Sequence, residues 1–244
     1  MPLCRIGARV LFFVHIPKTG GTTIERHLRA HGQVALTFPG MLGFARAPFQ
    51  HMEKGVHELV VPPDFYDDGF AVLRDPLDRL LSAFKFRSIW QANLDPTVVV
   101  PVDGADDWRL RMERRLESPG RSGPNVTLVG QPLSFNDWVP RIFEDFQSDP
   151  HVLDNHIRPQ QHFTLRSHWW FLFEDGISPV LDWIDDWVGV TVERESQPAN
   201  ATPGTSPMVS NDVAQMVRDF YRDDYGMRNW LRGQPGKPAK SKTT

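Results

Sequence analysis

The sequence predicts an α/β fold in which helices flank an open parallel β-sheet. Two segments support this prediction, because in each an apolar strand runs directly into a polar turn that opens a helix, first over residues 10–31 and again over residues 70–90. Strands and helices that alternate in this way favour a parallel sheet. Both turns then lie at the carboxyl ends of strands, where open α/β sheets bind ligands.

The remaining elements follow from the spacing of apolar residues along the chain. We expect strands at residues 9–15, 33–37, 70–73 and 169–173. We expect helices at residues 22–31, 53–59, 76–90, 105–117, 134–147, 177–188 and 210–225. Pro, Ser, Thr and Lys are frequent in the last part of the chain, so residues 196–208 are expected to form a loop and residues 233–244 a disordered tail.

The composition is typical of one globular domain. A chain of 244 residues with 40% hydrophobic content can bury one sizeable core, so we expect a single domain over residues 1–232. The net charge of −3 argues against a nucleic-acid-binding protein. The single cysteine, Cys4, excludes an intrachain disulfide and favours a reducing, cytoplasmic compartment. The apolar run at residues 10–14 is too short to span a membrane, and nothing in the sequence predicts an oligomeric state.

The first strand–turn–helix unit has the features of a phosphate-binding loop. Two adjacent glycines, Gly20 and Gly21, allow the backbone to approach a ligand closely, and the first amides of the following helix attract an anion. Lys18 adds a positive charge. Hydroxyl donors come from Thr19, Thr22 and Thr23. The alternative is an ordinary turn in which Thr22 or Thr23 caps the helix.

The order of residues in this loop differs from that of the nucleotide-binding P-loop. In the P-loop the lysine follows the glycines, and the next hydroxyl holds magnesium. Here Lys18 precedes Gly20 and Gly21, and no Gly-Lys-Ser/Thr tripeptide is present in the segment. The loop is therefore P-loop-like, and an ATP-dependent kinase or nucleotide hydrolase that needs magnesium is an alternative rather than the leading hypothesis.

The second unit offers groups that suit a terminal phosphate. Its strand ends at Arg74, and Asp75 and Pro76 then provide the N-cap and the first position of a helix. Ser82 lies on that helix, off its apolar stripe. An arginine fork and a serine hydroxyl suit a phosphate monoester. The alternative is a local ion pair between Arg74 and Asp75 with no ligand.

Taken together, the two units resemble the motifs of sulfotransferases that use 3′-phosphoadenosine 5′-phosphosulfate (PAPS). The resemblance is closest to the carbohydrate sulfotransferase family that includes the heparan 2-O and chondroitin enzymes and many bacterial relatives. Residues 15–22 (HIPKTGGT) are similar to that family's 5′-phosphosulfate loop, and residues 73–82 (LRDPLDRLLS) to its 3′-phosphate motif. The resemblance extends to residues 50–59, 154–160 and 220–225, and it leaves residues 91–133 unmatched.

This resemblance implies a sulfotransferase fold. It also implies an enzyme that moves the sulfuryl group from PAPS to an acceptor hydroxyl by in-line displacement. The implied acceptor is a carbohydrate or glycoconjugate. It implies that the 5′-phosphosulfate lies over the two glycines and that the 3′-phosphate meets Arg74 and Ser82. Lys18 then lies at the leaving phosphate and supplies the counter-charge, so no metal is expected. Residues 91–133 are expected to be an insertion on the acceptor side. A catalytically silent nucleotide- or glycan-binding protein on the same fold is a further alternative.

The resemblance also implies a histidine base. His51 corresponds to the histidine that the family places in this segment, and imidazole titrates near neutral pH as a general base must. His57 is the competing candidate, because Gln50 replaces a glycine of the pattern common in bacterial members. Three residues of another family motif are candidates near the acceptor or donor. These are His156, Arg158 and Gln160.

Metal binding is not expected in the histidine-rich region from residue 151 to residue 168. None of its histidine pairs has the helical spacing with an intervening glutamate that marks a zinc protease, and no cysteine is available as a partner.

Overall fold

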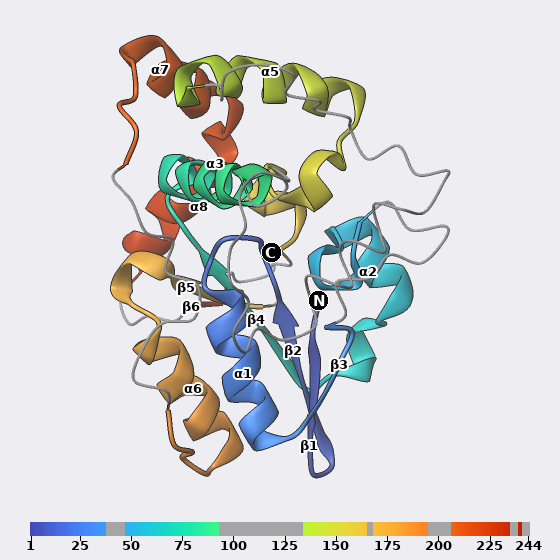
Figure 1. Cartoon of the computed structure of the whole chain (residues 1–244). Coiled ribbons are helices and arrows are strands. Elements are labelled where there is room, and N and C mark those ends of the chain that lie inside the picture. The colour runs from blue at the N-terminus through green and yellow to red at the C-terminus, as the bar shows by residue number, and fades with distance from the viewer. Residues whose placement is uncertain (38–46, 93–133, 165–167, 195–205, 235–238, 241–244) are drawn as a thin grey trace.

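The computed structural model describes residues 1–37, 47–92, 134–164, 168–194, 206–234 and 239–240. Six strands form one sheet in the order β3-β1-β2-β4-β5-β6 (Figure 1). The strands are Leu3–Ile6 (β1), Arg9–Val14 (β2), Gln33–Ala35 (β3), Asp68–Leu73 (β4), Trp169–Leu172 (β5) and Ala239–Lys240 (β6). The neighbours β2, β4 and β5 are parallel, which confirms the predicted α/β fold. The outer pairings are antiparallel, and β1 and β6 were not predicted.

The described helices agree with those that the apolar spacing predicts. They are Gly21–His31 (α1), Lys54–Val60 (α2), Pro76–Ala92 (α3), Phe135–Ser148 (α5), Ser178–Val188 (α6), Asn211–Phe220 (α7) and Arg222–Arg232 (α8). The helix expected over residues 210–225 is instead two helices, because Tyr221 leaves helical geometry between them. The helix expected near 105–117 and most of the loop expected at 196–208 lie outside the described residues.

Short local signals set where these helices begin. The Ser134 and Ser210 hydroxyls accept hydrogen bonds from the amides of Asp137 and Val213, so each serine caps its helix, α5 or α7. Asp75 does the same for α3, where its Oδ1 accepts from the Leu77 amide at 2.9 Å. Helix ends follow local signals too: at the carboxyl end of α6, Gly189 adopts the left-handed conformation that commonly ends a helix.

Alternating side chains of the central strands fill two cores, one on each face of the sheet. On one face, Leu11 and Phe13 of β2 pack against α1 and α6. On the other, Phe12 and Val14 pack against the N-terminal residues and against Leu231 of α8. All four strand side chains are fully buried. The sheet is therefore covered on both faces, as a parallel sheet requires.

A third apolar cluster lies beyond the carboxyl end of the sheet, where α3, α5 and α7 pack together (Figure 1). Its buried members include Leu80 of α3, Val139 and Ile142 of α5, and Val217 of α7. This helical layer begins directly after β4, so it brings α3 to the end of the sheet where the two predicted phosphate-binding turns lie.

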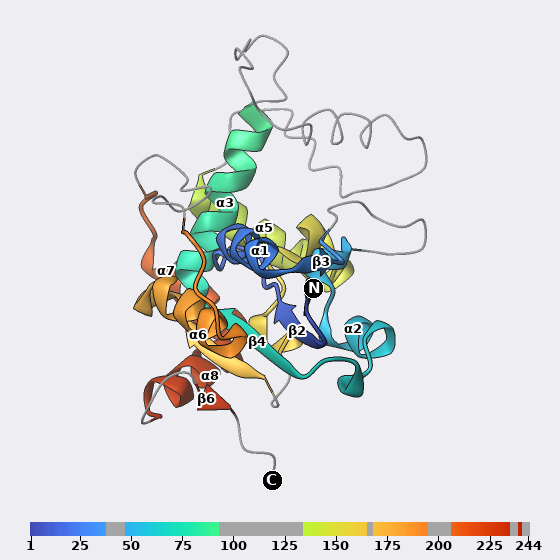
Figure 2. The same cartoon turned by 90° about the horizontal axis from the view of Figure 1, so that it is seen from below.

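The last strand pairs where disorder was expected. Ala239 and Lys240 form β6 beside Trp170 and Trp169 of β5. Figure 2, the view from below, shows β3 and β6 at opposite ends of the sheet. The other residues of the expected tail from 235 onward lie outside the described part of the chain. None of the described helices is long and apolar enough to cross a lipid bilayer.

Candidate functional site

The loop between β2 and α1 is built around two glycines that no other residue could replace without a shift. Gly20 has φ 86° and caps α1, and a Cβ there would lie 2.6 Å from Ile177 Cδ1. A Cβ on Gly21 would lie 1.9 Å from His15 Nε2, so it would overlap the imidazole ring. Lys18 also has a positive φ of 69°, which is uncommon for a residue with a side chain. The loop is thus held in a tight conformation at the amino end of α1.

The hydroxyls of this loop have different surroundings. Thr19 is fully buried, and its Oγ1 donates to the Ile16 carbonyl at 2.9 Å, so this hydroxyl closes the loop from within. Thr22 is exposed and Thr23 is partly exposed on the first turn of α1. Of the three threonines predicted to contact phosphate, two therefore have side chains at the surface, and the third acts inside the loop.

The two predicted phosphate-binding units touch one another. The Arg74 guanidinium donates from one of its terminal nitrogens to the Lys18 carbonyl at 3.1 Å. Its central carbon lies 4.5 Å from the ring centre of Phe173, which follows β5. Because β2 and β4 are parallel neighbours, their carboxyl ends bring Lys18 and Arg74 together. Ser82 follows on α3 and is partly exposed.

Asp75 does not serve as the local ion-pair partner that was considered for Arg74. Its Oδ2 accepts from Arg228 of α8 at 3.0 Å, while its Oδ1 caps α3. Arg228 also pairs with Glu174 at 3.1 Å and is only 2% exposed. Burial lowers the pKa of Arg74, and the nearby carboxylates of Asp78 and Glu174 oppose this shift. Arg74 thus remains a cation beside the loop.

Gln160 holds the backbone at the end of β4. Its Oε1 accepts from the Arg74 amide at 2.9 Å, and its Nε2 donates to the Arg74 carbonyl at 2.8 Å. The Gln160 amide in turn donates to Asp224 Oδ2 at 2.8 Å. Gln160 is fully buried. The structure therefore places this predicted site residue behind Arg74, where it fixes the position of the arginine through the main chain.

Three histidines and one phenylalanine connect the loop to α3. The rings of His15 and His51 meet edge to face at 5.1 Å between centres, and those of His51 and His156 do so at 5.0 Å. His156 stacks on Phe86 of α3 at 5.8 Å. The Lys18 ammonium lies 4.0 Å from the centre of the same Phe86 ring. We call His15, His51 and His156 the histidine row. It brings the predicted base His51 and His156 to the loop that holds Lys18.

The histidine row is buried, with each of its members less than 10% exposed. Burial lowers the pKa of His15 to about 3, and the positive charges of the N-terminus and of Lys18 add to the shift, so this imidazole is neutral at physiological pH. The Nδ1–H of His156 donates to the Leu153 carbonyl at 2.6 Å. In a neutral His156 the lone pair is then on Nε2.

The competing base candidate, His57, lies in a different environment. It is 1% exposed, its Nε2–H donates to the Phe163 carbonyl at 3.1 Å, and its ring meets Phe12 edge to face at 5.3 Å. Burial lowers the pKa of His57. These contacts are with the core on one face of the sheet, so the structure separates His57 from the histidine row.

Arg158 supports the segment that contains His51. It pairs with Glu53, and its Nε donates to Asn155 Oδ1 at 3.0 Å. The Asn155 Nδ2 donates to the His51 carbonyl at 2.8 Å. Beside it, the fully buried Arg79 of α3 donates to the carbonyls of His156 and Arg158 at 3.0 and 2.7 Å. These bonds tie His51 and His156 to α3.

Sequence reasoning missed His15, Phe86, Phe173 and Arg79. His15 was available in the sequence, since it lies between the strand and the loop, but nothing local signals that it faces Gly21. The contacts of Phe86, Phe173 and Arg79 depend on pairings across the fold, and no spacing pattern reports them.

Comparison with known proteins adds one match. A family model described as the sulfotransferase family matches residues 5–227, a range that includes the loop, the Arg74 turn and the histidine row. No curated protein matches the chain.

Proposed function

Because the chain belongs to the sulfotransferase family, we propose that it uses PAPS as the donor and transfers the sulfuryl group to a hydroxyl of a carbohydrate or glycoconjugate. The observation that supports this most is the contact between Arg74 and the Lys18 carbonyl. It joins the two predicted phosphate-binding units in one place, as a nucleotide with phosphates at two positions needs.

The residues at this place fit such a donor. Gly20 and Gly21 place the backbone amides of the loop at the amino end of α1, which favours a phosphate group. Lys18 and Arg74 add two cations, and Ser82 adds a hydroxyl on α3. When bound, PAPS supplies the activated sulfuryl group. We propose that the loop amides, Lys18 and Thr22 bind its 5′ end and that Arg74 and Ser82 bind its 3′-phosphate.

Lys18 has the central electrostatic role in this proposal. Negative charge develops on the leaving phosphate oxygen during transfer, and a preorganised cation with loop amides stabilises such charge. The Lys18 backbone is fixed by its own positive φ and by the bond from Arg74, so its ammonium starts from a defined position next to Phe86. Preorganisation of this kind is what makes a donor effective in a transition state.

His51 is the proposed general base. It lies in the histidine row between His15 and His156, and its backbone is held by Asn155. The neutral His15 adds no positive charge beside it. The His51 imidazole accepts the acceptor's hydroxyl proton at a ring nitrogen. We assign His156 the role of orienting His51 and the acceptor, and His57 a structural role in the core.

Donor binding is the first test. Thermal shift with adenosine 3′,5′-bisphosphate in the absence of magnesium should raise Tm, by an amount that corresponds to about 2.7 kcal/mol at a ligand concentration of 100 times Kd. Arg74→Ala should abolish the rise, whereas Arg218→Ala, which removes an exposed arginine of α7 far from the loop in sequence, should keep it. Stabilisation by ATP with magnesium alone would refute the proposal in favour of a kinase or nucleotide hydrolase.

Transfer is the second test. Labelled PAPS is incubated with a panel of glycans, and sulfated products are identified by mass spectrometry, which also defines the acceptor class. Donor binding with no transfer across a broad panel would instead favour a catalytically silent binding protein.

A cytoplasmic location is also part of the proposal, and it rests on the single, buried cysteine.

A further inference from the structure

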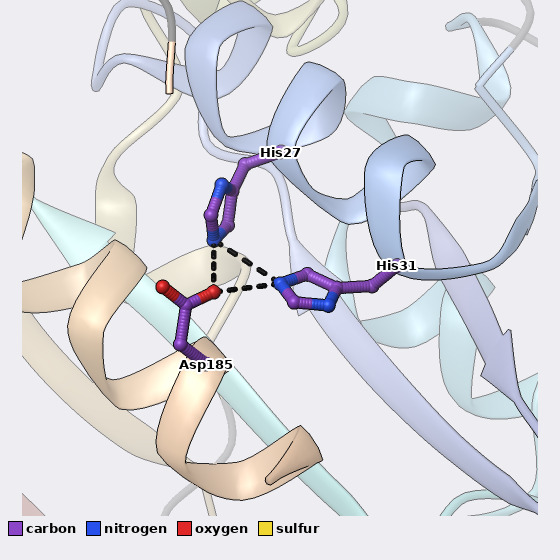
Figure 3. Close-up of side chains that lie close together, drawn as sticks. All are labelled: His27, His31 and Asp185. Atoms are coloured by element: carbon purple, nitrogen blue, oxygen red, sulfur yellow. Dashed lines mark hydrogen bonds and ion pairs between the residues drawn. The ribbon is translucent and has the colours of Figure 1, made fainter. Parts of the chain in front are cut away.

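A second group of titratable side chains lies away from the histidine row, between α1 and α6. His27 and His31 of α1 and Asp185 of α6 point toward one another (Figure 3). The Nε2 atoms of both histidines lie 2.7 Å from the same oxygen, Asp185 Oδ1. Their side chains are at most 4% exposed. Three potential ligand atoms thus converge in a nearly closed space.

The sequence brings these residues together through helix geometry. His27 and His31 are four residues apart on α1, so they share one face of the helix. Asp185 belongs to the buried face of α6, which packs on α1 through Leu28, Ile184 and the other apolar residues of the shared core. Polar side chains buried between apolar helix faces are costly unless each of them has a hydrogen-bond or metal partner.

The separation of the two imidazole nitrogens matches that in a tetrahedral metal centre. Imidazole nitrogens bind zinc at about 2.0–2.1 Å, so two of them are about 3.3–3.4 Å apart at the tetrahedral angle. The Nε2 atoms of His27 and His31 are 3.4 Å apart. Asp185 Oδ1 lies 2.7 Å from each Nε2 atom, which is closer than two ligands of one ion would be. It needs to move away from the two nitrogens by only about 0.6 Å to make room for an ion.

The carboxylate also has the outer support that metal ligands require. Arg194 donates to Asp185 Oδ2 at 2.5 Å, so it leaves Oδ1 to the histidines. Arg194 pairs with Asp182 at 2.7 Å as well. Hydrogen bonds of this type orient a ligating carboxylate, and the second acid offsets the charge of the arginine.

We propose that His27 Nε2, His31 Nε2 and Asp185 Oδ1 form a binding site for a divalent transition-metal ion of the zinc type. Two imidazoles and one carboxylate are ligands that zinc accepts, with water in the fourth position. In the metal-free chain both imidazoles donate an Nε2 hydrogen to the carboxylate, and on binding each takes the Nδ1–H tautomer and offers its Nε2 lone pair. No metal was expected from the sequence, because Lys18 can supply the counter-charge at the donor and the histidines of residues 151–168 lack a zinc-binding spacing.

The site has a structural consequence for the phosphate-binding loop. An ion at this position ties α1 to α6, and the amino ends of these two helices meet at the loop, where Ile177 before α6 lies against Gly20. The proposed ion therefore stabilises the packing that shapes the loop. This inference does not depend on the donor, the acceptor or the proposed transfer.

The direct test uses the full-length wild-type protein after removal of metals with a chelator. Titration with Co²⁺ should give the visible absorption of tetrahedral cobalt at one equivalent per chain, and Zn²⁺ should displace it. Zn²⁺ alone should raise Tm by about 5–10 °C at a free concentration of 100 times Kd. A wild-type protein that binds neither ion would overturn the proposal and leave a hydrogen-bonded contact between the two helices.

Variants then locate the site. His31→Gln and Asp185→Asn should each weaken Zn²⁺ binding by at least about 100-fold. Loss of a residue that only hydrogen-bonds a metal ligand already weakens binding by about 10-fold to 100-fold. His162→Gln is the matched control, since it removes an exposed histidine outside the cluster, and it should bind as the wild type does. Circular dichroism in the presence of chelator establishes that each variant is folded. Equal binding by His31→Gln and the wild type would show that the ion lies elsewhere and would overturn the assignment.

Discussion

The protein has two groups of clustered histidines, and they differ in what surrounds the imidazoles. In the histidine row, His51 meets the rings of His15 and His156, and aromatic contacts continue through Phe86 to Lys18. Between α1 and α6, His27 and His31 instead share a carboxylate oxygen. The first group lies at the carboxyl end of the parallel strands, and the second lies between two helices that cover one face of the sheet.

The comparison shows how the neighbours of a histidine decide its chemistry. A neutral imidazole among other rings at the donor loop can accept a proton from a bound hydroxyl. Two imidazoles that face one carboxylate form a ligand set for a cation. We therefore expect substitutions in the histidine row to change turnover and substitutions between α1 and α6 to change metal binding.

The largest expected effect is that of His51→Ala on turnover. Loss of a general base should lower kcat by about 10²-fold to 10⁴-fold. Binding of adenosine 3′,5′-bisphosphate should stay within about threefold of wild type, because the donor contacts proposed for Lys18 and Arg74 are kept. Steady-state kinetics and thermal shift on the same preparation measure the two quantities.

His57→Gln is the matched control for that experiment. It removes a second histidine from the same segment, but one that contacts Phe12 and Phe163 in the core. It should lower Tm and leave the kcat of the folded protein nearly unchanged. If His57→Gln instead reduced kcat as much as His51→Ala, the assignment of the base would be wrong.

Lys18→Ala should have the next largest effect. Removal of a group that stabilises the leaving phosphate should lower kcat by roughly 10²-fold, with a smaller effect on KM for the acceptor. Lys54→Ala, which removes an exposed lysine of α2, is the control. Activity of Lys18→Ala close to wild type would contradict the proposed role of Lys18, whatever the acceptor is.

Much of the fold was predictable because it depends on local signals. Apolar runs, the Asp75 cap and the glycine turn predicted β2, α1, β4 and α3, and parallel strands necessarily bring the ends of β2 and β4 together. Strand β1, which lies between β3 and β2, was missed because the burial pattern of its four residues, Leu3–Ile6, has no distinctive period. The break at Tyr221 was missed because apolar spacing continues across it.

The candidate site was predictable only in part. Lys18, Gly20, Gly21 and Arg74 belong to sequence motifs, and their residue types indicate phosphate binding. The choice between His51 and His57 could not be made from the sequence, because it depends on which side of the chain faces the core. Gln160 was expected near the acceptor or donor, and its bonds to the Arg74 backbone depend on how the short 3₁₀ helix Gln160–His162 lies beside the end of β4.

Gly21→Ala tests whether the loop tolerates any side chain beside the histidine row. The added Cβ would overlap the His15 ring, so the loop or the imidazole must shift, and overpacking of this kind lowers the free energy of unfolding by about 1–3 kcal/mol. Donor binding should weaken as well. Gly55→Ala in α2, where an added Cβ meets no atom within 4 Å, should be neutral or stabilising by up to about 1 kcal/mol. Denaturant unfolding of both variants measures the difference.

Near neutral pH, the smallest expected effect is that of the His15 titration on stability, and it grows as the pH falls. Burial lowers the pKa of His15 from 6.5 to about 3 in the folded chain. Between these values the unfolded state binds the additional proton, so the stabilisation is present above about pH 6.5 and is lost as the pH falls toward 3. The slope from one such group is at most about 1.4 kcal/mol per pH unit.

His15→Gln removes this titration, so the free energy of unfolding should fall less steeply between pH 6.5 and 4 than it does in the wild type, even where the variant is less stable at neutral pH. Urea unfolding at a series of pH values measures the slope directly. Other buried histidines with lowered pKa values, such as His57, remain in the variant and keep part of the slope. An unchanged slope would mean that the burial of His15 beside Gly21 does not hold this imidazole neutral, and the account of its lowered pKa would then be wrong.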